Sequence, residues 1–200
     1  MAFTYLALGD SYTIGEQVLL TESFPYQAVQ QLRKKNIDVA APEIIAKTGW
    51  TSWELLHAVQ AWKFQPSYSF VSLLMGVNNQ YRGAGLEQFD NDFPQLVTTA
   101  IELAGNHAAQ VFVFSIPDWG VTPFAASRDG EVIHEEINIY NARVTKYAEA
   151  KGCNYIDITF SQRRDGNKPA FLASDGLHPS GKEYAKWATT LAEKIRAFTG

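Results

Sequence analysis

The chain has 200 residues, of which 46% are hydrophobic and 19% are charged, and its formal net charge is -4. This length and composition are typical of a folded globular protein, and we expect one domain over residues 1–200. Lysine and arginine are scattered and form no basic stripe, which excludes nucleic acid as an expected partner. The lone cysteine, Cys153, excludes an internal disulfide, and the apolar stretch that it opens predicts a buried, inert thiol.

Membrane insertion is not predicted, because no segment of the sequence is long and apolar enough to cross a bilayer. The first residues, MAFTYLALGD, lack the basic start and the small-residue cleavage site of a signal peptide. We therefore expect a cytoplasmic protein; a periplasmic or secreted one would require that a removed signal peptide was replaced by Met-Ala. No feature of the sequence indicates an oligomeric state.

Short apolar segments recur along the chain, mostly without the alternation of a half-exposed strand. They are Phe3–Leu8, Glu43–Ala46, Tyr68–Met75, Gln110–Ile116 and Asn154–Ile158. Runs of this kind are typical of strands that are buried on both faces of a sheet. The second run is the weakest, because Pro42 interrupts its start and few of its residues are apolar.

Helical patterns fill the stretches between these segments. They cover Phe24–Lys35, Thr51–Phe64, Leu86–Gly105, Glu131–Lys151 and Ser180–Phe198. Thr51 with Glu54, and Ser180 with Glu183, have the spacing of a capping box, which marks the start of a helix. Alternating strands and helices predict an α/β protein with a five-stranded parallel sheet and helices on both faces.

Ligand sites of such sheets lie at the carboxyl ends of the strands, so we expect the functional residues in the loops after the predicted strands. They contain GDS at 9–11, KTGW at 47–50, GVNNQ at 76–80, PDWG at 117–120 and DGLHP at 175–179. Acyl transfer needs a nucleophile, a base, a group that orients the base, and donors for an oxyanion. Residues of all four kinds are predicted at one end of the sheet.

Each candidate residue has a role in that chemistry and a simpler alternative. Ser11 can act as the nucleophile and His178 as its base, with Asp175 accepting the N–H of the ring. Gly49 can offer a backbone N–H, and Asn78 a side-chain amide, to an oxyanion. Taken alone, Ser11 is more simply a helix cap, and Gly49 and Asn78 are turn residues. Asp175 and His178 would be a surface turn or a pair of metal ligands. Their joint placement favours the catalytic interpretation.

With these residues the sequence resembles the SGNH, or GDSL-type, hydrolases. The first of these names lists a Ser, a Gly, an Asn and a His, which lie in separate sequence blocks. The matching residues are Ser11 in GDSYTIG, Gly49 in KTGWT, Asn78 in GVNN, and His178 in DGLHP with Asp175. The blocks stand in the family's order and span residues 9–178. The resemblance implies a three-layer α/β/α, flavodoxin-like sandwich with strand order 2-1-3-4-5. It also implies hydrolysis of a small-molecule ester through an acyl-enzyme, without metal or cofactor.

The resemblance also assigns roles to these residues. It implies a catalytic triad of Ser11, Asp175 and His178. It implies an oxyanion hole made by the backbone N–H groups of Ser11 and Gly49 and by the side chain of Asn78.

The third block departs from the family, because Asn79 stands where an Asp is usual. The donor Asn78 is kept, so the departure affects the support of its loop rather than the chemistry.

The G-x-S-x-G elbow of α/β-hydrolases is absent around Ser11, which disfavours that fold. A rival from another class is a flavodoxin-like, FMN-binding protein with a phosphate cradle at 11–15, but Glu16 would place negative charge beside that phosphate.

Three aromatic residues in or beside the loops at the carboxyl ends of the strands are candidates for binding substrate, namely Trp50, Tyr81 and Trp119. They can line an acyl pocket or stack on a sugar ring. The longest candidate cover, Asp118–Gly130, is too short and too polar for a broad lipid-docking surface. We therefore expect short-chain esters as substrates, with a carbohydrate O-acetyl esterase or a thioesterase of the same family as the alternatives.

Overall fold

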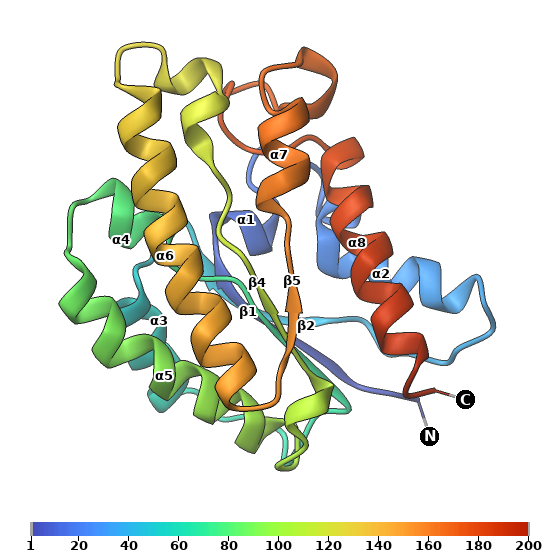
Figure 1. Cartoon of the computed structure of the whole chain (residues 1–200). Helices are drawn as coiled ribbons and strands as arrows, with labels where there is room; N and C mark the ends of the chain where they lie inside the picture. Colours follow the sequence, from blue (N-terminus) through green and yellow to red (C-terminus); the bar gives the residue numbers. More distant parts are fainter. Residues whose placement is uncertain (1, 200) are drawn as a thin grey trace.

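The structure, a computed structural model, describes residues 2–199 and is built around a five-stranded parallel sheet. The strands are β1 (Tyr5–Asp10), β2 (Glu43–Lys47), β3 (Phe70–Leu73), β4 (Val111–Phe114) and β5 (Asn154–Ile156). Their order, β2-β1-β3-β4-β5, is the predicted one. All neighbouring strands are parallel, so their carboxyl ends meet at one edge of the sheet, the upper edge in Figure 1.

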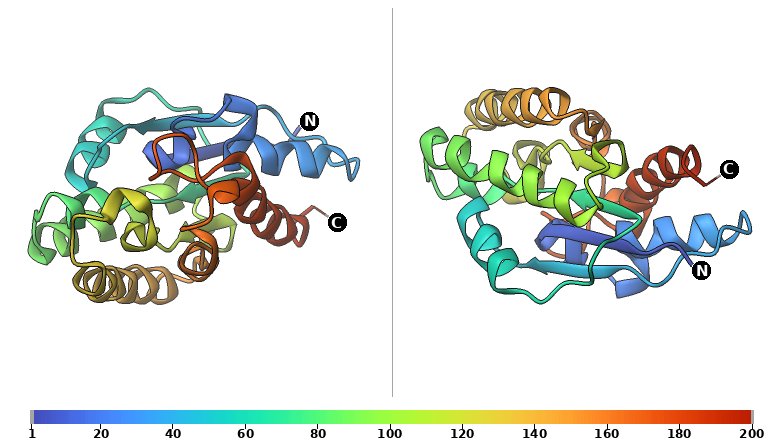
Figure 2. Two further views of the ribbon diagram at one scale, coloured as in Figure 1. Left: turned by 90° about the horizontal axis from the view of Figure 1, so that it is seen from above. Right: turned by 90° about the horizontal axis from the view of Figure 1, so that it is seen from below.

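Helices cover both faces of the sheet and complete three layers (Figure 1 and Figure 2). On one face lie α2 (Phe24–Arg33) and α8 (Gly181–Arg196), and on the other α3 (Ser52–Ala61), α5 (Leu86–Leu103) and α6 (Gly130–Ala150). Shorter helices follow strand ends, namely α1 (Ser11–Ile14), α4 (Val77–Tyr81) and α7 (Thr159–Asp165). The 3-10 turns are η1 (Leu20–Glu22), η2 (Ala108–Gln110), η3 (Trp119–Val121), η4 (Pro123–Ala125) and η5 (Pro169–Phe171). Within residues 2–199, no helix combines the length and the apolar character that crossing a membrane requires.

The predicted strands and long helices are all present with shifted ends, whereas α1, α4 and α7 lie outside the predicted elements. These helices have four, five and seven residues, which is too short for an apolar repeat to show in the sequence. Two of them carry residues of the predicted site. The sequence pattern therefore missed local structure where the candidate chemistry lies.

Burial explains why the strand segments do not alternate. Every residue of β1, β3 and β4 is buried, because helices cover both faces of these strands. The β2 strand lies at the edge of the sheet, where Glu43 and Ile44 are half-buried and Lys47 is exposed. Its weak sequence signal reflects this edge position.

An aromatic cluster fixes α2 and α8 on their face of the sheet. The Phe24 ring of α2 lies 4.8 Å from the Phe114 ring of β4 and 6.2 Å from the Trp187 ring of α8. All three side chains are buried. Burying a side chain of this size contributes roughly 1.5–3 kcal/mol. The cluster therefore ties α2 to β4 and to α8, whose rings lie 90 and 163 residues further along the chain than Phe24.

Only one of the two predicted capping boxes is present. At the start of α3, Glu54 Oε2 accepts from the Thr51 N–H at 2.8 Å, which is the capping-box bond to the first backbone N–H, and from the Thr51 hydroxyl at 3.0 Å. Ser180 begins α8 without a side-chain cap, and its hydroxyl donates instead to the Ala170 carbonyl at 2.9 Å. Glu183 is buried and accepts from Trp187 Nε1 at 3.1 Å. The Ser161 hydroxyl of α7 also donates to Glu183 Oε1, at 2.5 Å. The second prediction is wrong because residues outside the capping box are the hydrogen-bond partners of both side chains.

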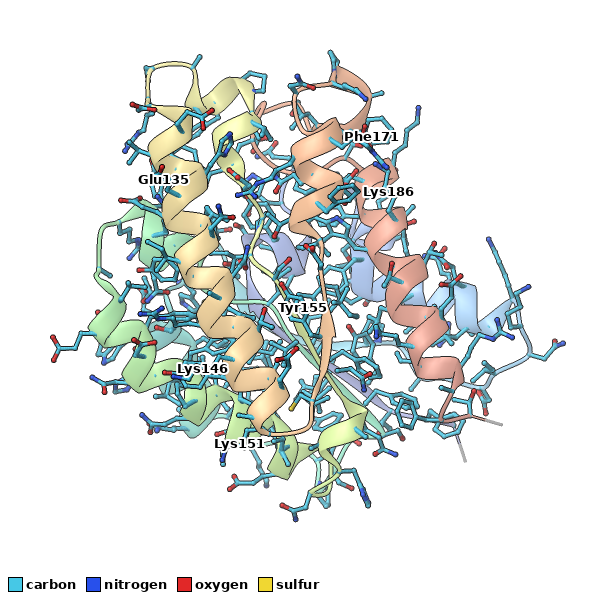
Figure 3. The ribbon with its side chains drawn as sticks, viewed as in Figure 1. Glu135, Lys146, Lys151, Tyr155, Phe171 and Lys186 are labelled. Atoms are coloured by element: carbon cyan, nitrogen blue, oxygen red, sulfur yellow. The ribbon has the colours of Figure 1, made fainter. Side chains whose placement is uncertain are left out.

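Charged contacts hold the corner between α7 and α8. Asp165 accepts from Lys168 Nζ at 2.7 Å and from Lys186 Nζ at 2.6 Å. The Lys186 ammonium also lies 3.9 Å from the centre of the Phe171 ring, and Figure 3 labels both residues. The loop between η5 and α8 starts from this corner, and that loop contains Asp175 and His178.

Candidate active site

Ser11 is the first residue of α1, directly after β1. The helix cap is Asp10, whose carboxylate accepts from the Tyr12 N–H at 3.0 Å. A Cβ at Gly9 would lie 2.0 Å from Thr13 Oγ1, so this tight passage from strand to helix accepts only glycine. Asp10 thus fills the capping role that was the simple alternative for Ser11, and the serine hydroxyl is left for another partner.

That partner is His178, which lies 167 positions further along the chain. Its Nε2 is 3.0 Å from Ser11 Oγ, and its Nδ1 is 2.6 Å from Asp175 Oδ2. The ring is buried, which limits competition from water for both bonds. These distances are the ones that a serine nucleophile, its base and the group orienting that base require.

Asp175 is held by the backbone as well as by the ring. Its Oδ1 accepts from the N–H groups of Leu177 and His178, each at 3.0 Å. Burial alone would raise the pKa of Asp175, but the hydrogen bonds from the His178 ring and from the two N–H groups outweigh it and lower the pKa. An ionised carboxylate only accepts, so it keeps the His178 proton on Nδ1 and leaves Nε2 to face the serine.

The buried ring of Tyr12 supports the imidazole from one side. Its centroid lies 5.0 Å from that of the His178 ring and 6.4 Å from that of Trp187. Burial, followed by the charges of Asp10 and Asp175, raises the pKa of Tyr12 well above its ordinary value. The phenol therefore stays neutral and acts as a packing surface.

Gly49 lies in a tight turn after β2. The Trp50 N–H donates to the Lys47 carbonyl at 3.2 Å, and Gly49 has a φ of +79°, which is typical of the third position of a type II turn. The Thr48 hydroxyl donates to Glu16 from the loop after α1. Among the described residues, no hydrogen-bond acceptor is assigned to the Gly49 N–H.

Asn78 lies on α4, and its amide points back to the first two blocks. Its Nδ2 donates to the Trp50 carbonyl at 3.0 Å and to Asp10 Oδ2 at 3.3 Å. Ser11, Gly49 and Asn78 all line the same pocket as His178. The structure therefore brings together the residues that the sequence placed in separate loops.

Asp10 is a site residue that the sequence analysis did not single out beyond its place in GDS. It is fully buried beneath Ser11 and Asn78. Burial raises its pKa to about 7, although the hydrogen bonds from the Tyr12 N–H and from Asn78 act in the opposite direction. Asp10 is thus a buried acceptor for one of the two bonds that the Asn78 amide donates.

Asn79, which replaces the family's usual Asp, belongs to a buried network. Its Nδ2 donates to Ser52 Oγ at 2.8 Å, and Ser52 Oγ donates to Asp92 Oδ2 at 3.0 Å. Its Oδ1 accepts from the Ser52 N–H at 2.9 Å. The carboxylate of this network is supplied by Asp92 on α5, so the loop that carries Asn78 keeps its support despite the departure.

The pocket beside Ser11 has a volume of about 230 Å³. Its apolar wall consists of Val77, Tyr81, Trp119, Phe124 and Leu177. Trp50, which we also predicted near the substrate, does not line this pocket, because its ring packs against the core. Val77 and Leu177 had no signal in the sequence beyond their place inside a block, and Phe124 had none beyond its place in the predicted cover Asp118–Gly130.

Buried polar contacts hold Trp119 in this wall. Its Nε1 donates to Gln80 Oε1 at 2.7 Å. The neighbouring Asp118 is fully buried, and its carboxylate lies 2.6 Å from both His134 Nδ1 and Arg163 Nε. His134 therefore supports the wall of the pocket through Asp118. Within residues 2–199, no group of three or more His, Cys, Asp and Glu side chains is placed to hold a metal ion.

Comparison with known proteins connects this geometry to a family. The chain matches the GDSL-like lipase/acylhydrolase family over residues 7–186, a stretch that includes every block of the site. No curated protein matches the chain.

Several solved structures share the fold. A lipase/acylhydrolase from Enterococcus faecalis has a TM-score of 0.76 and 18% identity, over 100% of this chain and 98% of that chain. The psychrotrophic esterase EstA from Pseudoalteromonas sp. has a TM-score of 0.73 and 17% identity, over 98% and 97% of the two chains. For Axe2, an acetylxylan esterase from Geobacillus stearothermophilus, the TM-score is 0.74 and the identity 16%, over 96% and 94%. At these identities the likeness shows a common fold.

The Asn79 network predicts the outcome of restoring the family's Asp. In Asn79→Asp, two buried carboxylates would compete for the single Ser52 hydroxyl proton, and we expect a loss of about 2–4 kcal/mol in unfolding free energy. Adding Asp92→Asn reverses the direction of the network, since the new amide can donate to Ser52 Oγ. Urea unfolding should therefore show the double variant to be more stable than Asn79→Asp alone. Additive losses from the two substitutions would contradict the network.

Asp10 predicts a pH dependence of stability. Its folded pKa of about 7 lies above the value near 4 of an unfolded Asp, so the folded protein binds the extra proton between these values. The stabilising contribution of protonated Asp10 is complete below about pH 4 and is lost as the pH rises towards about 7. Urea unfolding across this range should show a smaller decline in Asp10→Asn than in the wild type. Asp38→Asn, at an exposed position outside the helices and strands, is the control and should decline as the wild type does.

Proposed function

The chain belongs to the GDSL-like lipase/acylhydrolase family and is a hydrolase of ester bonds, and from this we propose that it is a serine esterase with Ser11 as its nucleophile. The observation that carries the proposal is the buried hydrogen-bonded series from Ser11 Oγ through the His178 ring to Asp175. It stands at the mouth of an apolar pocket. Because the chain belongs to this family, the esterase is preferred over the flavin-binding protein that was the alternative.

In the first step, His178 Nε2 removes the proton from Ser11 Oγ, and the oxygen attacks the carbonyl carbon of the ester. Asp175 stabilises the imidazolium that forms, and its two backbone N–H bonds keep it from rotating away. The imidazolium then gives its proton to the departing alcohol. Water repeats the sequence on the acyl-enzyme, with His178 again as base, and releases the acid.

The oxyanion of each tetrahedral intermediate would bind the backbone N–H groups of Ser11 and Gly49 and the side chain of Asn78. Support comes from the common pocket and from the Gly49 N–H, which has no assigned acceptor in the described chain. Asn78 Nδ2 has two hydrogens, and the longer of its bonds, 3.3 Å to Asp10, is the one that an oxyanion would replace. Such donors stabilise the charge that develops in the transition state.

The size of the pocket favours short acyl groups. Its volume of about 230 Å³ is below the roughly 300–1,000 Å³ of pockets that enclose drug-sized ligands. The Asp118–Gly130 segment folds into the short turns η3 and η4 and carries Phe124 into the pocket wall. A site of this kind does not need a lipid interface to become active.

An acetylated sugar is a second candidate substrate. Tyr81 and Phe124 are 41% and 44% exposed and present their rings at the edge of the pocket. Exposed rings of this kind can stack on the flat apolar face of a sugar while Ser11 attacks a small acyl group. The thioesterase alternative has no comparable observation in its favour.

The role of Ser11 is tested with a fluorophosphonate probe, which reacts with activated serines. We expect one adduct on the wild type, mapped to Ser11 by peptide mass spectrometry, and none on Ser11→Ala. Esterase activity of Ser11→Ala should fall by several orders of magnitude, because the nucleophile is lost. The matched control is Ser174→Ala, in the same group of loops. An adduct on another serine, or full activity of Ser11→Ala, would exclude the proposed role.

The preference for short acyl groups is tested with p-nitrophenyl esters of increasing chain length, below and above the concentration at which micelles form. The rate constant kcat/KM should be highest for acetate or butyrate and should not rise when micelles appear. Acetylated xylo-oligosaccharides are assayed beside them, and a clear preference for these would favour the sugar ester. A maximum at long chains, or activation by micelles, would identify a lipase instead.

A further inference from the structure

Arg82 makes a short contact with the turn that carries Gly49. Its Nη2 donates to the Gly49 carbonyl at 2.6 Å, and a Cβ at Gly49 would lie 3.0 Å from the same nitrogen. The bond joins the loop after β2 to the helix after β3. Hydrogen bonds from a charged donor are about twice as strong as those between neutral groups.

The same arginine belongs to the helical turn of Asn78. It caps the carboxyl end of α4, and its backbone N–H donates to the Asn78 carbonyl at 3.0 Å. Gly49 and Asn78 are the two oxyanion donors proposed on loops outside the Ser11 block. Arg82 is thus tied to one of them through the backbone and to the other through its side chain.

A second arm of the guanidinium faces Glu54. Arg82 Nη1 lies 3.4 Å from Glu54 Oε2, and that carboxylate also accepts from the N–H and the hydroxyl of Thr51. Although burial acts against it, these two bonds and the charge of Arg82 lower the pKa of Glu54. The carboxylate is anchored at the start of α3, so the planar fork of Arg82 has two fixed acceptors.

The turn at Gly49 lies partly at the surface, and among the side-chain hydrogen bonds of the described residues only the one from Arg82 holds the Gly49 carbonyl. Lys47 and Thr48 are exposed, and glycine adopts more backbone conformations than any other residue. The Gly49 N–H and C=O belong to neighbouring peptide planes joined at one Cα, so a fixed carbonyl plane leaves fewer combinations of φ and ψ through which the N–H could turn away from the pocket. Arg82 and Glu54 are 48% and 31% exposed, and ion pairs of this exposure contribute little to the stability of the fold.

We propose that Arg82 is a positioning residue for catalysis, which sets the orientation of the Gly49 N–H relative to Asn78 and thereby preorganises the oxyanion hole. This inference rests on the proposed esterase function. Arg82 would contribute to catalysis by geometry, because a hydrogen-bond donor must be aligned before the negative charge of the oxyanion develops. Neither the motif blocks nor the spacing of the sequence indicates this contact.

Steady-state kinetics on a hydrolysed p-nitrophenyl ester test the proposal. In Arg82→Ala, kcat should fall about 10- to 100-fold with little change in KM, which is less than the 10²–10³ loss expected for Asn78→Ala. Arg82→Lys should be intermediate, since an ammonium reaches one acceptor without the fork. The matched control is Arg33→Ala, which removes an arginine bond to the Val39 carbonyl far from the site and should keep its kcat.

Two further measurements separate positioning from a general structural role. Added guanidinium, far below its denaturing concentration, should restore part of the kcat of Arg82→Ala, whereas tetramethylammonium should not. In the unliganded protein, the 15N resonances of residues 47–50 should broaden by exchange in Arg82→Ala and stay sharp in Arg33→Ala.

The outcomes distinguish this proposal from the proposed function. A wild type that hydrolyses no ester and reacts with no fluorophosphonate would overturn the esterase, while the resonances of 47–50 still report on the contact. An active wild type with unchanged kcat in Arg82→Ala would overturn the positioning role. An effect on KM alone would assign Arg82 to substrate binding, and equal losses of kcat in Arg33→Ala would make the effect nonspecific; both results would also overturn it.

Discussion

The hydrogen bond between His178 Nε2 and Ser11 Oγ, at 3.0 Å, joins the loop after the first strand to the last loop of the chain. Two flexible loops cannot hold such a distance by themselves, because each bond would have to offset the entropy of ordering both. The sheet fixes Ser11 through β1, which is buried along its whole length. The contacts of Asp165 fix the start of the loop that carries His178, and the Tyr12 ring packs against the His178 ring.

Two buried polar side chains near this contact, Asp10 and Asn79, have directed partners. Asp10 accepts from Tyr12 and Asn78, and the Asn79 network ends on Asp92. Leaving such a group unpaired costs about 1–3 kcal/mol, so the partners restrict how the loops can move. The same bonds that satisfy the interior therefore hold the candidate donors in place, and Arg82 extends this arrangement to the exposed turn at Gly49.

The elements that the sequence predicted correctly are those whose signal is local or periodic. The buried strands lack alternation because both faces are covered, and the Thr51–Glu54 box forms because its partners are neighbours in the chain. The Ser180–Glu183 box fails because Glu183 turns inward to Trp187. Trp50 packs against the core, while Phe124, which the sequence marked only as part of the candidate cover Asp118–Gly130, reaches the pocket.

The sequence by itself determined the α/β layers through its alternating strand and helix patterns, and the family resemblance implied the strand order. It also singled out five candidate residues, because their blocks follow predicted strands or precede a helix: Ser11, Gly49, Asn78, Asp175 and His178. Only the tertiary structure decided which groups support them. The contacts of Asp10 with Asn78 and of Arg82 with Gly49 join residues 68 and 33 positions apart. Contacts across such separations depend on how the strands pair and how the helices pack, and no local pattern of residues encodes the resulting distances.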